Sequence, residues 1–224
     1  MTDITRVPQW IFQLGGHAFT VNATTLIMSW VVMAGLLLFA ALAARRLRLV
    51  PGPLQSAAEV LVASFRTLVD ETLGRLGGAY FPLILTLFVF ILLSNWLGMI
   101  PFLEEPTKDL NTTLILGIVG FVVAHVSAIR VKGFRAYARG YFQPFFFMFP
   151  LNVIGELAKV VSLSFRLYGN IMGGSIIILV VSHLVRHLVL PPLLNLFFGA
   201  FVGTIQAFVF AMLTLTYISV AIQE

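Results

Sequence analysis

The sequence predicts an all-α polytopic membrane protein with about five membrane helices and one amphipathic surface helix. Of its 224 residues, 59% are hydrophobic and only 10% are charged, and the mean hydropathy is +1.00. A soluble domain carries about a quarter charged residues, so this composition cannot cover a water-facing surface. In so apolar a chain, the net charge of +5 is best explained by basic loops that set the orientation of the protein in the bilayer. It does not indicate a nucleic-acid partner.

Three uncharged stretches are long enough to cross a bilayer as ordinary helices, namely residues 22–44, 80–100 and 111–129. A hydrocarbon core of ~30 Å needs roughly 20 apolar residues in a helix that rises ~1.5 Å per residue. Residues 53–76 instead mix apolar residues with Glu59, Arg66, Asp70, Glu71 and Arg75. This mixture predicts an amphipathic helix that lies on the membrane surface.

The two remaining apolar stretches, residues 141–185 and 188–222, are longer than one ordinary crossing. The second has no charge over 35 residues, and as one helix it would measure roughly 52 Å. Each stretch is therefore either a short hairpin or a single helix tilted far beyond the usual ~20°. The residues alone favour neither arrangement.

Basic residues set the expected orientation. With the N-terminus outside, residues 1–21 form an outer segment and the C-terminus lies in the cytoplasm. The outer segments then hold Arg6, Lys108 and Arg186. The inner loops hold Arg45, Arg46, Arg48, Arg66, Arg75, Arg130, Lys132, Arg135 and Arg139. This positive-inside bias is clear. We find no internal repeat or linker, so residues 1–224 are expected to form a single membrane domain.

Arg166 is the most unusual residue, because it lies in the apolar context VVSLSFRLYGNIMGG. An arginine at mid-membrane costs about 2.5–3.5 kcal/mol on insertion scales. At 100° per residue, Lys159, Arg166 and Asn170 lie near one helix face, with Glu156 toward its edge. One interpretation is a buried polar seam in which Glu156 pairs with Lys159. No acid lies within a turn of Arg166, so its counter-charge must come from another helix or another chain.

Small residues accompany this stripe. Gly169 and Gly173 follow Arg166 on or near its face, and Gly199, Gly203 and Ala207 are spaced by four in the last stretch. Such faces let helices approach closely in lipid. Either the two long stretches pack on each other, or they offer a smooth surface to a partner helix.

The segment SLSFRLYGNIMGG, with Arg166 and Asn170, resembles the signature of subunit a of rotary F-type ATP synthases. The segment GTIQAFVFAMLTLTYISVAI, with Gln206, resembles the C-terminal helix of that family, and ELAKVVSLSFR and PTKDLNTTL also match. The resemblance covers essentially the whole chain. It implies that residues 141–185 and 188–222 are single, steeply tilted helices that face a ring of c subunits.

The resemblance implies a non-catalytic stator subunit of a rotary ATP synthase in the bacterial inner membrane. It would provide two ion half-channels and couple ion flow to ring rotation. Its partners would be the c-ring, the b subunits of the peripheral stalk and the lipid bilayer, and no cofactor is expected. Arg166 would face the ion-binding carboxylates of the ring. Asn170 and Gln206 would line the same interface or simply bond the helices together, and Glu156 would belong to the cytoplasmic half-channel.

The sequence departs from the family pattern at two positions. Proton-conducting members usually carry an acid nine positions after the arginine and often a titratable residue seven before the glutamine. Here these positions are Ser175 and Gly199. The outer half-channel therefore uses other groups, such as His183, or passes a hydrated ion such as sodium, as in the N-type synthases that this chain also resembles. The sequence therefore leaves open whether the coupling ion is the proton or sodium.

Most of the other polar residues near the outer side have two interpretations each. Asp109 and Glu104 would draw cations to the outer entrance, or they belong to a solvated acidic loop. His183 would relay protons, or it is an interfacial residue, and His187 is expected to be an interfacial residue.

Two other functions compete with the stator hypothesis. A self-contained secondary transporter would use the membrane charges to bind a substrate, but the chain is small and has no inverted repeat. An intramembrane enzyme would need a catalytic constellation. The sequence has no cysteine and no HExxH-type histidine pair, so we expect neither thiolate catalysis nor a metal site.

Overall fold

The computed structural model describes residues 9–14, 17–44, 51–100, 103–142, 145–184 and 190–223. In this part of the chain, five helical segments are long and apolar enough to cross a membrane. The prediction of an all-α polytopic membrane protein is therefore confirmed. One small addition was not predicted, because strands β1 (Gln9–Leu14) and β2 (His17–Asn22) pair antiparallel within the expected outer segment.

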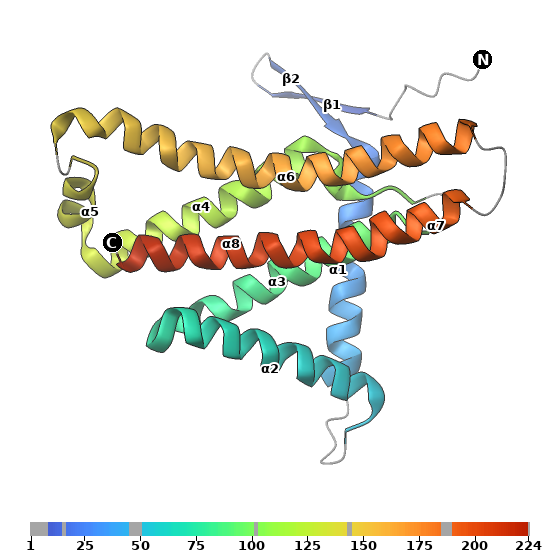
Figure 1. Ribbon diagram of the computed structural model, residues 1–224, viewed down its shortest axis with the longest axis horizontal. Coiled ribbons are helices and arrows are strands. Elements are labelled where there is room, and N and C mark those ends of the chain that lie inside the picture. Colours follow the sequence, from blue (N-terminus) through green and yellow to red (C-terminus); the bar gives the residue numbers. More distant parts are fainter. Residues whose placement is uncertain are drawn as a thin grey trace.

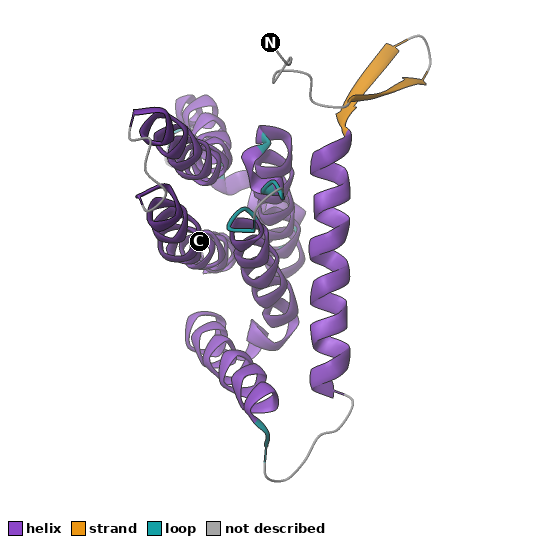
Figure 2. Cartoon of the chain, turned by 90° about the vertical axis from the view of Figure 1, so that its right-hand side faces the viewer, coloured by secondary structure: helices purple, strands orange, loops and turns teal. Residues whose placement is uncertain are grey.

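Helix α1 (Ala23–Ala44) follows the hairpin directly and stands beside the rest of the helices (Figure 2). The Asn22 side chain accepts a hydrogen bond from the backbone N–H of Thr24 at 3.1 Å, which caps the first turn. Most of its large apolar side chains are exposed, among them Trp30, Leu37 and Leu38. Because this surface is apolar throughout, it suits lipid or a neighbouring subunit.

The expected surface helix is α2 (Pro53–Leu73), and it is amphipathic as predicted. Phe65 and Val69 are buried in the core, whereas Arg66 and Asp70 form an exposed ion pair at 3.6 Å. Gly74 then turns the chain with a φ of +57°, a conformation that few residues other than glycine adopt easily. The short helix η1 (Gly74–Leu76) leads into α3 (Gly77–Leu97).

A short connection joins α3 to the next membrane helix. It contains η2 (Pro106–Lys108) and ends at the start of α4 (Leu110–Lys132). Helix α5 (Phe134–Gly140) and η3 (Phe146–Met148) then lead into the first long helix.

The two long stretches are continuous helical elements rather than hairpins, and the first helix begins at Phe149 rather than at residue 141. Helix α6 (Phe149–Leu184) runs unbroken through 36 residues, which is about 54 Å. Helix α7 (Leu190–Leu196), the π-helical segment η4 (Phe197–Val202) and α8 (Gly203–Gln223) follow one another without a break. Both long elements run side by side and cross the direction of α1 (Figure 1). A helix longer than the bilayer is thick must tilt, so their length and their direction agree.

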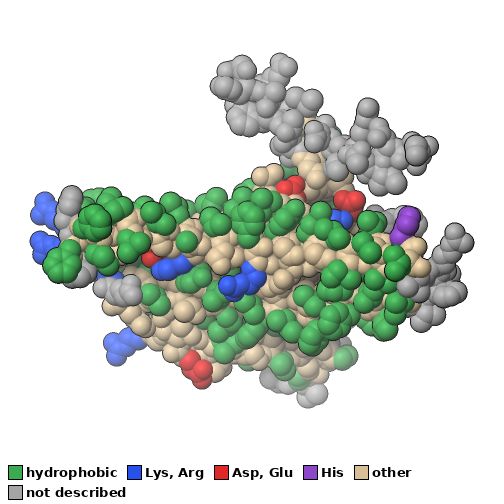
Figure 3. Space-filling model, turned by 45° about the horizontal axis from the view of Figure 1, so that its top comes forward, with side chains coloured by type: hydrophobic (Ala, Val, Ile, Leu, Met, Phe, Trp, Pro, Cys, Tyr) green, Lys and Arg blue, Asp and Glu red, His purple; other side chains and the backbone are tan. Residues whose placement is uncertain are grey.

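Helix α8 lies at the centre of the packing, where it contacts α2, α3, α4 and α6. Phe210, Leu215 and Ile218 are fully buried there. By contrast, α6 buries only the face that includes Leu163, Leu167 and Ile171. Its opposite face is free, and Figure 3 shows that this side of the molecule is mainly hydrophobic with a few isolated charged side chains.

The contact between α3 and α8 requires glycine at position 203. A Cβ atom there would lie 2.9 Å from the Cβ of Asn95, which sits close to the α3 backbone and cannot move aside easily. We therefore expect Gly203→Ala to lower the free energy of unfolding by about 1–3 kcal/mol, the usual cost of overpacking. Thermal unfolding in detergent, followed by circular dichroism, measures this loss.

Gly35→Ala is the matched control, because a Cβ atom at position 35 would meet nothing within 4 Å. That change is expected to be neutral or to stabilise α1 by up to about 1 kcal/mol through helix propensity. Equal melting temperatures for Gly203→Ala and the unaltered protein would contradict the packing described above.

Candidate functional site on helices α6 and α8

Arg166 lies on the exposed face of α6. Its guanidinium has no ion-pair or hydrogen-bond partner among the residues that the structure describes. Next to it, a Cβ atom at Gly169 or Gly173 would meet nothing within 4 Å. The arginine therefore projects from a smooth strip of helix. Because an uncompensated charge in an apolar layer is costly, the strip suits a partner that brings a negative charge.

Asn170 follows Arg166 by one helical turn and joins α6 to α8. Its Nδ2 donates a hydrogen bond to Oε1 of Gln206 at 2.6 Å. Gln206 is only 3% exposed, and its Nε2 has no protein partner among the described residues. Buried amide groups are rarely left unpaired, so this donor is a place for a water molecule or a partner's acceptor.

The glycines of the last stretch do not share the exposed strip. Gly199 and Gly203 are buried. A Cβ atom at Gly199 would collide with Met99, just after α3, and one at Gly203 would collide with Asn95 of α3. Asn95 is fully buried and donates through Nδ2 to the Gly203 carbonyl at 2.9 Å. The expectation that the long stretches pack on each other through these residues is wrong for Gly199 and Gly203, which pack against Met99 and α3. Gly169 and Gly173 form a free surface, as the second interpretation expects.

Ser175, Gly199 and Asn170 come together at one small cavity of about 10 Å³. We call it the Ser175 cavity. It lies on the C-terminal side of Arg166, since Ser175 is nine residues further along α6, or about 14 Å. Its lining is formed by Asn95, Glu105, Asn170, Ile171, Ser175, Ile178, Asn195, Phe198 and Gly199.

Glu156 lies on the other side of Arg166, ten residues earlier on α6, or about 15 Å away. Its carboxylate accepts a hydrogen bond from Nζ of Lys159 at 2.6 Å, and both side chains are partly buried. This agrees with the expected pairing of the two residues. Lys159 also lies over the ring of Tyr217, 5.8 Å from its centroid.

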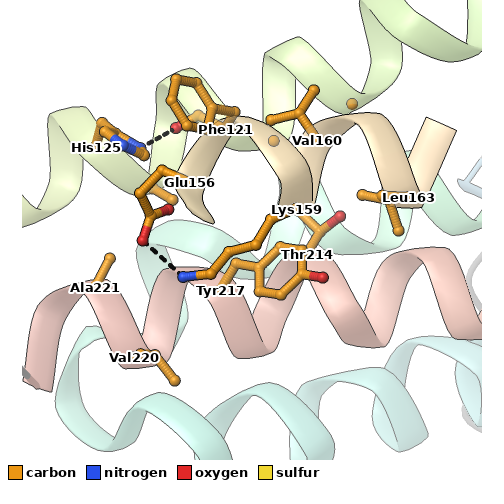
Figure 4. Close-up of a pocket in the computed structure, with 13 residues that line it drawn as sticks. Phe121, His125, Glu156, Lys159, Val160, Leu163, Thr214, Tyr217, Val220 and Ala221 are labelled. Carbon is orange, nitrogen blue, oxygen red and sulfur yellow. Dashed lines mark hydrogen bonds and ion pairs between the residues drawn. The ribbon is translucent and has the colours of Figure 1, made fainter. Parts of the chain in front are cut away.

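The Glu156–Lys159 pair lines a cavity of about 550 Å³, which we call the Glu156 cavity. Its lining also includes His125 of α4 and Tyr137 and Tyr141. An adjoining space of about 30 Å³ shares Glu156, Lys159 and His125, and extends to Leu163, one turn before Arg166 (Figure 4). Among the described residues, the Glu156 and Ser175 cavities have no lining residue in common.

A chain of hydrogen bonds crosses the Glu156 cavity. The hydroxyls of Tyr137 and Tyr141 lie 2.6 Å apart, and the Tyr141 hydroxyl lies 3.2 Å from Nε2 of His125. Burial and the hydrogen bond with Tyr141 raise the pKa of Tyr137 above its usual range. A tyrosine hydroxyl is protonated at neutral pH in any case, so Tyr137 can pass on a hydrogen bond without carrying charge, and the raised pKa extends this to alkaline pH.

The remaining predicted residues lie elsewhere. Asp109 caps α4 by accepting from the backbone N–H of Asn111 at 2.9 Å, and it accepts from the Thr25 hydroxyl of α1 at 3.3 Å. Glu104 is exposed in the connection after α3. His183 is exposed in the last turn of α6, away from both cavities. His187 falls outside the described residues. No group of three or more metal-ligating side chains occurs in the described ranges.

Sequence reasoning did not select Asn95, Glu105 or His125. A signal existed for two of them, since Asn95 and His125 are polar residues inside otherwise apolar spans. Glu105 gave no such signal, because acidic residues in loops are common.

A family model described as ATP synthase A chain matches residues 26–219. The chain belongs to this family. ATP synthase subunit a of Moorella thermoacetica is 41% identical over 212 residues, which cover 95% of both chains. ATP synthase subunit a 2 of Pelobacter propionicus is 39% identical over 219 residues, which cover 96% of this chain and 92% of that one. ATP synthase subunit a of Geotalea uraniireducens is 36% identical, with 93% and 91% covered.

Membership of the ATP synthase A chain family supports a stator role in the membrane sector of an ATP synthase. It therefore favours the stator hypothesis over a self-contained transporter or an intramembrane enzyme. The five apolar helical segments agree with a multi-pass membrane subunit.

The hydrogen bond between Asn170 and Gln206 can be measured by a double-mutant cycle with Asn170→Ala and Gln206→Ala. We expect a coupling free energy of about 0.6 kcal/mol, and at most about 1.7 kcal/mol, as for other polar pairs between membrane helices. Unfolding of each variant in mixed micelles measures it. A cycle of Asn170→Ala with Ser182→Ala is the control, because Ser182 bonds only within its own helix. Equal coupling in both cycles would contradict the assignment.

Proposed function

We propose that this chain is the non-catalytic stator subunit of a rotary ATP synthase and that it couples ion flow to rotation of a c-ring. The observation that carries the proposal is the position of Arg166. Its guanidinium is exposed on a smooth apolar helix face, is unpaired within the described chain, and lies between two separate polar cavities. The relatives that are named ATP synthase subunit a support the same role.

In this proposal, Arg166 meets the carboxylates of the ring one after another. The guanidinium attracts the ionised carboxylate and so favours release of its bound ion. An arginine suits this task because it stays protonated and presents a planar fork of donors, whereas lysine loses its proton more readily when it is desolvated. The same fixed charge repels a cation and prevents direct leakage past the interface.

The two cavities would belong to the two half-channels. The Glu156 cavity would open to the cytoplasm, toward which the basic loops point by the positive-inside rule. The Ser175 cavity would lie on the path to the outer side. Because the cavities share no described lining residue, an ion must leave through one, ride the ring and return through the other. The membrane field then supplies ~2.3 kcal/mol per charge per 100 mV.

The N-terminal half would serve assembly. The apolar surface of α1 and the amphipathic helix α2 are the expected contacts of the b subunits in the peripheral stalk. The N-terminus would lie outside the bacterial inner membrane and the C-terminus in the cytoplasm.

Arg166→Ala is expected to abolish ATP-driven ion pumping in inverted membrane vesicles, because the ring carboxylates lose the charge that discharges them. ATP hydrolysis by the detached soluble head should persist. The measurement is ion uptake, assayed for protons and for sodium, together with ATPase activity.

Arg135→Ala is the matched control, since Arg135 is an exposed arginine of α5 outside both cavities. It should pump like the unaltered complex. Normal pumping by Arg166→Ala would rule out the proposed function.

A further inference from the structure

A fully buried polar contact holds η2, the short helix that follows Glu105, against the membrane helices. The Thr107 hydroxyl donates to Oδ1 of Asn95 at 2.8 Å, and neither side chain is exposed. Asn95 is in turn bonded to the Gly203 carbonyl. This anchor fixes the backbone of η2 near α3 and α8, and so it also positions the backbone from which the half-buried Glu105 side chain extends.

The Glu105 side chain occupies room that only a glycine leaves. A Cβ atom at Gly98 would collide with the carboxyl group of Glu105. On the other side of this turn, Nδ2 of Asn195 lies 3.4 Å from the Gly98 carbonyl. The carboxyl is thereby directed inward from the loop, and Glu105 lines the Ser175 cavity.

The surroundings of this carboxyl contain little charge. α3, α6, α7 and η4 bring only uncharged groups to the described lining of the Ser175 cavity, the polar ones being Asn95, Asn170, Ser175 and Asn195. Lys108 and Glu104 are the charged neighbours, both from the connection between α3 and α4. Burial raises the pKa of Glu105, and the negative charge of Glu104 raises it further. A hydrogen bond with its own backbone and the positive charge of Lys108 act in the opposite direction but do not cancel the rise.

We propose that Glu105 is the proton-exchanging carboxyl of the outer half-channel, in place of the acid that the sequence lacks at Ser175 and Gly199. The inference rests on the function proposed above and names both the residue and the coupling ion. Glu105, Ser175 and Gly199 line the same cavity although they come from three different elements. A carboxylate from the loop thus reaches the cavity that positions 175 and 199 also line.

The size of the cavity favours protons over sodium. At about 10 Å³ it has room for roughly one water molecule. A sodium ion with its hydration shell does not fit, whereas a proton moves along side chains and a single water. Gln206 can hold a water molecule next to this path, because its Nε2 has no protein partner among the described residues and its Oε1 accepts from Asn170, which lines the cavity.

The transfer needs no further reactant. The Glu105 carboxylate takes a proton from a hydronium ion at the outer side, which forms one O–H bond and leaves water. It then gives that proton, through a water molecule, to a ring carboxylate that Arg166 has emptied. During ATP-driven pumping the same steps run in reverse.

The test uses the assembled synthase in inverted vesicles and measures ATP-driven acidification as a function of pH, with and without sodium. Glu105→Gln should reduce proton pumping by about a hundredfold, the lower end of what a positioned proton-transfer group contributes. Glu104→Gln is the comparison variant. It should keep most of the pumping and move the pH profile only slightly toward lower pH, because Glu104 does not line the cavity and its charge only adds to the pKa of Glu105. In the double variant Glu105→Gln with Ser175→Glu, pumping should return with a shifted pH optimum, because the new carboxyl enters the same cavity.

The outcomes separate this inference from the proposed function. Normal pumping and an unchanged pH profile in Glu105→Gln would overturn the role of Glu105, provided that Arg166→Ala is inactive in the same vesicles. Strict dependence of the unaltered complex on sodium would overturn the assignment of the proton. If Glu105→Gln does not assemble with the c-ring, Glu105→Asp replaces it, and an unchanged pH profile there would overturn the inference equally.

Discussion

An arginine side chain without a partner, set on the apolar face of a long membrane helix, is the constraint on which the rest depends. Arg166 finds no counter-charge among the described residues of its own chain. The cost of such a charge in lipid, about 2.5–3.5 kcal/mol or more, must be met by another molecule. In the proposed function, this other molecule is the c-ring, and the free face of α6 is the surface that the ring would contact.

The remaining helices hold this face in position. Helix α8 is packed against α2, α3 and α4, and Asn95 of α3 bonds its backbone at Gly203. Because α8 is fixed, Gln206 can hold Asn170, and with it the turn of α6 that follows Arg166. The glycines have two roles. Gly203 allows α8 to pack closely on α3, whereas Gly169 and Gly173 leave the surface beside Arg166 open. In the proposed function, this rigid packing keeps Arg166 at a constant depth in the membrane while successive carboxylates of the ring pass it.

The hydrophobic pattern, the number of membrane spans and the unusual position of Arg166 in an apolar stretch could be predicted from the sequence. Composition reports how much apolar surface must be covered, and a lone arginine stands out in such a background. The choice between a hairpin and a tilted helix could not be made from the residues, because both bury the same side chains. The inward turn of Glu105 could not be predicted either. It depends on the space that Gly98 leaves for the carboxyl and on the hydrogen bond between Thr107 and Asn95. These contacts join a loop to a helix, and the sequence pattern does not show which loop residues meet which helix residues.

The most direct test of the account is a cryo-electron microscopy map of the complete synthase. The account predicts that the guanidinium of Arg166 faces the ring and lies within about 4 Å of a carboxylate of a c subunit, the distance of an ion pair. A map in which Arg166 points into lipid, or in which a carboxylate of its own chain pairs with it away from the ring, would contradict it.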